Sequence, residues 1–89
     1  MPRRERAAVV AAILRAIEEH VEMHGEDARV TRVATTANLP YDRLVVYLEH
    51  LARTGLVTDA KKPRLTEKGR EFLRQHAQWT ELLGRFGLH

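Results

Sequence analysis

The stretch VATTANL, residues 33–39, decides how the middle of this chain folds. It places a small residue, Ala34, where two helices must approach each other closely. Asn38 follows Ala37 at the turn, and asparagine is the best residue other than glycine for the left-handed backbone conformation that a tight turn needs. Leu39 then supplies an apolar side chain for the corner between the helices. The stretch therefore predicts two helices joined by a tight turn.

The residues on either side extend this turn into a larger motif. Thr31 is a good N-cap for the short helix that precedes the turn, which is the second helix of the chain. Pro40 fixes the start of the next helix, which Gly55 ends. The buried face of that helix is expected to consist of Leu44, Leu48 and Leu51, with Tyr41 and Ala52 beside them. The spacing is that of a helix-turn-helix over about residues 31–54, although two core helices of a small bundle could also meet at such a turn.

Further elements are predicted outside the motif. Apolar residues recur at helical spacing over residues 5–24, which predicts a long first helix. Residues 56–58 and 64–66 are predicted to form two short strands around a polar turn, which gives a wing over about 56–66. A last helix is expected over about 67–86. This order is that of a winged helix-turn-helix, a mainly α fold with a small β-hairpin and a long C-terminal helix.

Length and composition limit the possibilities. The chain has 89 residues, so we expect a single domain over residues 1–89. It contains no cysteine, which excludes disulfides, thiolate metal sites and a thiol nucleophile. The longest apolar run, residues 7–14, is far shorter than the roughly 20 residues of a membrane span, and no signal peptide precedes it. We therefore expect an intracellular protein in the cytoplasm, associated with the nucleoid.

No pattern in the sequence indicates an enzyme. A Ser-His-Asp spacing, a Gly-rich phosphate loop and a paired carboxylate site are not recognisable, and so small a domain has little room for a substrate cleft. His20 and His24 stand four apart on a helix, a spacing that can bind a metal, but no third ligand is evident. We expect no enzymatic activity, cofactor, metal or small-molecule substrate.

Basic residues are concentrated in one segment. The chain has 15 lysine and arginine residues and 12 aspartate and glutamate residues. Residues 58–70 hold five of the basic residues and only two of the acidic ones. Cationic side chains at a loop tip can reach phosphates from either side of a DNA groove, whereas the alternative is a solvated turn. The candidate phosphate contacts of the wing and the last helix are Lys61, Lys62, Arg64, Lys68 and Arg70.

The outward face of the third helix is the candidate base-reading surface. At about 100° per residue, Val46 and Arg53 lie at its centre. Val46 could touch a thymine methyl group, and Arg43 could hydrogen-bond guanine or a phosphate. Because acidic residues also lie on this face, we expect the wing to supply most of the affinity; a face that binds protein, or has no reading role, is the alternative. The candidate base readers are Asp42, Arg43, Val46, Tyr47 and His50.

Two further sets are candidates for contacts to the DNA backbone. Hydroxyl groups and arginines often bind phosphate oxygens, and the second helix offers Arg32, Thr35 and Thr36. An N-terminal arm could enter a minor groove or simply be a solubilising terminus. Its basic residues are Arg3, Arg4 and Arg6.

A pattern of mostly structural positions extends over residues 35–84. It consists of Leu39 and Tyr41, Tyr47 with Leu48, Leu51 with Gly55 and Leu56, and Thr66 with Lys68 and Gly69. In this pattern the chain resembles the small archaeal winged-helix proteins of the ten-kilodalton DNA-binding class, with Asn38 where glycine is usual. The resemblance implies a DNA-binding domain that forms a homodimer by pairing its last helix with that of its mate.

The last helix independently carries an apolar stripe spaced four, three, four, three. It could pack on the first helix of its own chain, but aromatic residues near a chain terminus have little domain left to cover them. Since oligomerisation stabilises small chains, we expect a homodimer. The candidate interface residues are Phe72, His76, Trp79, Leu82, Leu83 and Phe86.

These patterns together favour a protein that binds double-stranded DNA, as a transcriptional regulator or an architectural protein, with or without sequence specificity. The alternative is a winged-helix module that binds protein within a transcription or repair assembly, through the face around Val46.

Overall fold

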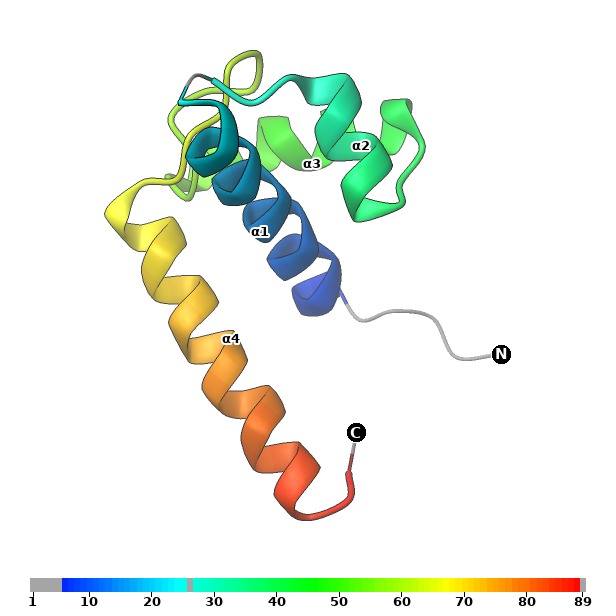
Figure 1. Ribbon diagram of the computed structural model, residues 1–89, viewed down its shortest axis with the longest axis vertical. Coiled ribbons are helices and arrows are strands. Elements are labelled where there is room, and N and C mark those ends of the chain that lie inside the picture. Colours follow the sequence, from blue (N-terminus) through cyan, green and yellow to red (C-terminus); the bar gives the residue numbers. More distant parts are fainter. Residues whose placement is uncertain (1–5, 26, 89) are drawn as a thin grey trace.

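The computed structural model describes residues 6–25 and 27–88. Within these residues the chain forms four helices, α1 (Arg6–His24), α2 (Val30–Ala37), α3 (Tyr41–Thr54) and α4 (Glu67–Arg85). Helix α1 contacts both α2 and α4, and α2 contacts α3 (Figure 1). None of the described helices is both long and apolar enough to cross a bilayer.

The core is formed where α1 meets α2, α3 and the segment after α3. Its largest fully buried side chains are Ile13, Leu14, Ile17, Val33, Leu44, Leu48, Val57 and Pro63. Each such aliphatic side chain contributes about 1.5–3 kcal/mol through burial. Tyr41 was predicted to lie on this buried side, and that prediction is wrong, because 53% of its surface is exposed. As the first residue of α3, Tyr41 lies beyond the end of the core.

The turn between α2 and α3 has the predicted conformation. Asn38 adopts φ 57° and ψ 50°, and its N–H group donates back to carbonyls of α2. The N–H of Leu39 also donates to the carbonyl of Ala34, at 2.9 Å. Gly55 ends α3 in the left-handed conformation, as expected. Thr31 is not the N-cap of α2: Arg29 occupies that position with an extended backbone, and its carbonyl accepts from the next turn, so the helix begins before Thr31.

The predicted β-hairpin is wrong: within residues 6–25 and 27–88 the chain is 73% helical and has no strand or sheet. Residues 56–66, called the wing loop below, come together only through one antiparallel bridge between Val57 and Leu65. On either side of the bridge, the N–H of Thr58 donates to the carbonyl of Arg64 and the N–H of Thr66 donates to that of Leu56. The described fold is therefore all-α, with a looped wing.

Three residues explain why no strands form. Pro63 has no N–H group to give to a ladder. The N–H of Arg64 donates to the side-chain oxygen of Thr58, at 3.2 Å, instead of a main-chain carbonyl. At the tip, the carboxylate of Asp59 accepts hydrogen bonds from the N–H groups of Lys61 and Lys62, both at 2.7 Å. Side chains thus satisfy the groups that would otherwise extend the ladder.

Helix α4 begins at a side-chain cap and then leaves the core. The hydroxyl of Thr66 accepts from the N–H of Gly69, as expected for the cap. Phe72 and Leu73 pack against the core. Towards its C-terminus α4 diverges from α1 (Figure 1), and Trp79 and Phe86 are exposed to 55% and 69%.

Candidate nucleic-acid interface

The structure brings the five candidate base readers onto one face of α3. One shallow hollow is lined by Asp42, Arg43, Val46 and Tyr47. Val46 and Tyr47 also line a neighbouring hollow, together with His50. Val46 is 65% exposed, whereas Tyr47 packs with one side against the core. These residues share a face because they are spaced at intervals of three and four and α3 is a regular helix over the whole segment.

Two arginines that were not among the candidate base readers also lie on this face. Arg53 and Arg6 line the hollow next to Val46 and His50. Arg53 lies seven residues after Val46, so its position at the centre of the face was a signal that it belongs to the set. Arg6 was expected in an N-terminal arm, but it is the first residue of α1, and the packing of α1 places it beside α3. Arg3 and Arg4, the rest of that arm, lie outside the described residues.

Within residues 6–25 and 27–88, the arginines of this face have no acidic partner. Among the ion pairs of the described residues, none involves the guanidinium of Arg6, Arg43 or Arg53. Among the described residues, the only carboxylate that lines either hollow is that of Asp42. An unpaired guanidinium retains all its donors for a phosphate or a base edge. The α3 face therefore presents more available positive charge than its sequence segment indicates.

The tip of the wing loop holds two further available cations. The hydrogen bonds from the N–H groups of Lys62 and Lys61, with a smaller contribution from their ammonium charges, lower the pKa of Asp59 below its ordinary value. This turn fixes the main chain while both lysine side chains remain exposed. Lys61 and Lys62 border a groove with Tyr41 and the first turn of α2. The wing tip therefore lies next to the N-terminal end of α3.

The other three candidate phosphate contacts bind oxygen atoms of the chain itself. The Nε of Arg64 lies 2.6 Å from the carboxylate of Asp27. Lys68 donates from Nζ to the carbonyl of Thr54, at 2.8 Å, at the C-terminal end of α3. Because these groups are largely exposed, each such contact contributes at most about 1 kcal/mol.

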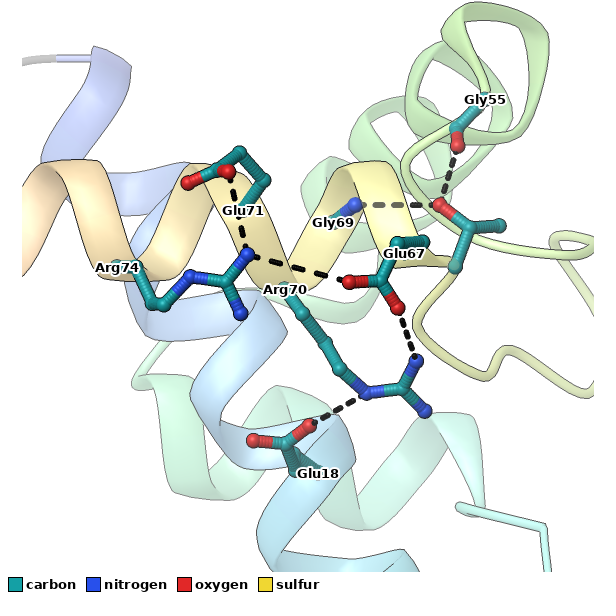
Figure 2. A network of polar contacts seen from close by, with 8 residues as sticks. Glu18, Gly55, Glu67, Gly69, Arg70, Glu71 and Arg74 are labelled. Atoms are coloured by element: carbon teal, nitrogen blue, oxygen red, sulfur yellow. Dashed lines mark hydrogen bonds and ion pairs between the residues drawn. The ribbon is translucent and has the colours of Figure 1, made fainter.

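Arg70 has two partners, as Figure 2 shows. Its Nε lies 3.6 Å from a carboxylate oxygen of Glu18 in α1, and its Nη1 lies 3.7 Å from one of Glu67. Arg74 extends the network by pairing with Glu67 and Glu71 (Figure 2). Arg74 also donates a hydrogen bond to the carboxylate of Glu71, and this hydrogen bond lowers the pKa of Glu71. The network fastens α4 to α1 and occupies Arg70.

A tight junction positions the wing loop relative to α3. The hydroxyl of Thr66 donates to the carbonyl of Gly55, at 2.5 Å, and accepts from the N–H of Gly69, at 3.1 Å (Figure 2). Gly69 is buried, and a Cβ atom added there would overlap the carbonyl oxygen of Leu56. The pattern of Thr66, Lys68 and Gly69 noted in the sequence thus joins the end of α3 to the start of α4.

Two of the three candidate backbone contacts of α2 make internal hydrogen bonds through their side chains. Thr35 donates from its hydroxyl to the carbonyl of Thr31, and the hydroxyl of Thr36 lies 3.1 Å from Nε2 of His20. Arg32 lines a hollow with His20 and His24, whose rings stack with their centroids 6.0 Å apart. Within the described residues no group of three histidine, cysteine or acidic side chains could hold a metal ion.

The candidate interface residues of α4 divide into two groups. Phe72 packs on the core and stacks with His76, so this end of the stripe contacts its own chain. Trp79, Leu82 and Phe86 are exposed and lie beyond it, with Leu83 partly exposed. Leu88, which follows the helix and was not among the candidates, is exposed to 67%. A large apolar surface thus gathers at the C-terminal end of α4.

Comparison with known families gave one match. A family profile described as winged helix-turn-helix matches residues 3–83, a range that includes α1 to α3, the wing loop and most of α4. A comparison with curated proteins gave no match.

Proposed function

From the premise that the chain belongs to the winged helix-turn-helix family, we propose that it is a transcriptional regulator. Membership of this family suggests binding to double-stranded DNA, and its members are generally not enzymes. The observation that carries the proposal is the set of guanidinium groups around the exposed face of α3 that form no ion pair within the described part of the chain. They provide sites for phosphate oxygens and base edges without first breaking an internal ion pair.

In the proposed complex α3 enters the major groove, which is about 12 Å wide and admits one helix. Arg6 and Arg53 bind phosphates at the edge of the groove, while Arg43 and His50 face the base edges. Lys61 and Lys62 contact the neighbouring backbone from the tip of the wing loop. Arg64, Lys68 and Arg70 hold the wing in place and add only long-range attraction. The protein acts on the nucleoid in the cytoplasm.

We also propose that the protein is a homodimer that pairs through the C-terminal half of α4. The exposure of Trp79 and Phe86, with Leu82 between them on the same side, supports this pairing because monomers rarely leave aromatic patches uncovered. The resemblance to the archaeal ten-kilodalton class supports the same arrangement. A dimer presents two α3 helices to one duplex.

The test of DNA binding is a salt titration with the full chain and a pool of random duplexes, followed by selection of the bound fraction. We expect affinity to fall by one to several orders of magnitude between about 50 and 200 mM salt, because bound cations are released from several phosphates. An enriched sequence supports a regulator, whereas tight binding without one supports an architectural protein. If no duplex binds at low salt, the proposal is wrong and protein docking around Val46 becomes the better explanation.

The test of the dimer is sedimentation of the wild type and of a Trp79→Asp variant. We expect the wild type to sediment as a dimer at micromolar concentration and the variant as a monomer, because the charge would be buried in an apolar interface. Tyr41→Asp is the matched control, since Tyr41 is an aromatic residue of similar exposure that lies outside α4. A monomeric wild type at high micromolar concentration contradicts the proposed dimer.

A further inference from the structure

The centre of the α3 face is apolar, which is unusual for a surface with so many unpaired cations. Val46 and Tyr47 lie between the two hollows of this face and line both of them. We call this pair the apolar step. The surface of the hollow shared with Asp42 and Arg43 is almost entirely apolar. Val46 is 65% exposed, and Tyr47 is partly exposed with one side packed against the core.

The rim of the apolar step is charged and asymmetric. On one side lie Asp42 and Arg43, and on the other lie Arg6, His50 and Arg53. The lining residues thus include one carboxylate and several guanidinium groups, none of which forms an ion pair within the described residues. The partner that complements this surface has a small apolar group at its centre and negative charge on both sides.

The major groove of DNA has this pattern. Its walls are phosphates, and the apolar group that base edges present in it is a methyl on C5 of a pyrimidine, as in thymine. Methylated cytosine carries the same group at the same position. A protein partner of the same shape would need an acidic rim around one small apolar side chain, whereas every duplex supplies the negative walls.

Resting on the proposed DNA binding, we infer that the apolar step of Val46 and Tyr47 reads the C5-methyl group of a pyrimidine in the major groove. Arg43 precedes Val46 by three residues, about 4.5 Å along the helix at 1.5 Å per residue. This distance is close to the roughly 3.4 Å between stacked base pairs. Arg43 therefore reaches the neighbouring base pair, where guanidinium groups favour the O6 and N7 atoms of guanine.

The same geometry assigns a role to Asp42. A carboxylate at the base edges accepts a hydrogen bond from N4 of cytosine. Asp42 lies beside Arg43 in the hollow, so a G·C pair next to the methylated pyrimidine satisfies both side chains. The acidic residue on this face then selects a sequence, although it reduces the attraction to phosphates. The preferred target is a methyl-bearing pyrimidine adjacent to a G·C pair.

The experiment uses the duplex enriched by selection and replaces each thymine in turn by deoxyuridine, which lacks only the methyl group. We expect one position at which affinity falls about fourfold, as for loss of one buried methyl-sized group. In a parallel series each cytosine is replaced by 5-methylcytosine. A gain of similar size at one cytosine, without a sensitive thymine, identifies methylated cytosine as the source of the methyl group.

Val46→Ala provides the protein side of the test. Alanine has a high helix propensity and Val46 is exposed, so we expect the variant to fold. It should bind the methylated and unmethylated duplexes equally. Val45→Ala is the matched control, because Val45 lies on the same helix but lines neither hollow; it should retain the difference.

The outcomes separate this inference from the proposed function. If salt-dependent binding occurs without an enriched sequence, or if no methyl group alters affinity, the inference is overturned and DNA binding stands. Methyl discrimination that persists in Val46→Ala also overturns it. Absence of binding to any duplex overturns the proposed function and the inference together.

Discussion

Basic side chains gather in two regions of this molecule that the fold uses differently. Around α3, Arg6, Arg43 and Arg53 have no acidic partner within the described residues. At the base of the wing loop and the start of α4, Arg64 and Arg70 pair with carboxylates that precede them in the chain. The charge balance of a sequence segment therefore does not measure the charge that the segment makes available to a partner.

The difference changes where DNA affinity is expected to arise. The sequence led us to expect most of it from the wing, where the net positive charge lies. In the structure only Lys61 and Lys62 of that cluster have side chains without an internal ion pair or hydrogen bond among the described residues. We now expect the α3 face and the wing tip to share the phosphate contacts, and the wing base to contribute mainly to stability.

The largest expected effect is on the α3 face. Replacing Arg6, Arg43 and Arg53 together by Ala should lower affinity at 0.1 M salt by about 100-fold or more. The lost phosphate contacts of Arg6 and Arg53 each reduce the slope of log K against log salt by about 0.9, and the loss of Arg43 removes a contact to a base edge. Stability should hardly change, since these groups make no ion pair with any residue that the structure describes. The measurement is a salt titration by fluorescence anisotropy.

The control for that variant is Arg64→Ala with Arg70→Ala, which removes two cations from the wing base. Its slope should change by less than that of the α3 variant, while its stability should fall by up to about 1 kcal/mol for each exposed pair. Equal slopes for the two variants would show that internal pairing does not keep Arg64 and Arg70 from DNA.

The second effect tests the junction that supports the wing. Gly69→Ala should destabilise the protein by about 2 kcal/mol, because the added methyl group overlaps the Leu56 carbonyl and forces the junction apart. Gly84→Ala is the matched control on the same helix. Apart from its chain neighbours and the backbone of its own helix, no atom of the described residues lies within 4 Å of its added Cβ, so we expect a gain of about 0.5–1 kcal/mol. Urea unfolding measures both; equal stability of the two variants would contradict a close junction.

A smaller effect should follow from freeing a paired arginine. Asp27→Asn removes the negative partner of Arg64, so the affinity for DNA should rise a few-fold and the salt slope should steepen by up to about 0.9. Stability should fall by no more than about 1 kcal/mol. Glu19→Gln is the control, since Glu19 forms no ion pair among the described residues. If both variants raise affinity equally, the gain reflects net charge alone.

The smallest effect concerns the wing tip. Because hydrogen bonds from Lys62 and Lys61 lower its pKa, Asp59 should titrate below 3.8 when followed by carbonyl NMR. Its contribution to stability is present above that value and is lost as the pH falls through the lower, folded-state pKa. Amide exchange at Lys61 and Lys62 should accelerate in Asp59→Ala. A midpoint at or above 3.8 would show that the turn is open in solution.

Features set by local backbone chemistry could be predicted from the sequence. Asn38, Gly55 and Thr66 each act where their side chain, or its absence, favours one backbone conformation, so neighbouring residues sufficed. The hairpin could not be judged in this way. Residues 56–58 and 64–66 have strand-like composition, but the side chains of Thr58 and Asp59 satisfy main-chain groups that a ladder would use.

The candidate site was predictable along one helix but not between elements. The helical period placed Val46 and His50 on one face because that property depends on α3 alone. The pairing of Arg64 with Asp27 joins residues 37 positions apart, and the placement of Arg6 beside α3 depends on how α1 packs. Such contacts follow from tertiary packing, which no local pattern encodes.

A wing made of a loop also affects how copies of this protein can meet. A strand at the edge of a sheet presents a row of free N–H and C=O groups, to which another chain can add a strand of almost any sequence. Within residues 6–25 and 27–88 the single bridge of Val57 and Leu65 offers no such row. The proposed self-association then depends on side chains such as Trp79 and Phe86, so substitutions on α4 can adjust it while leaving the α3 face intact.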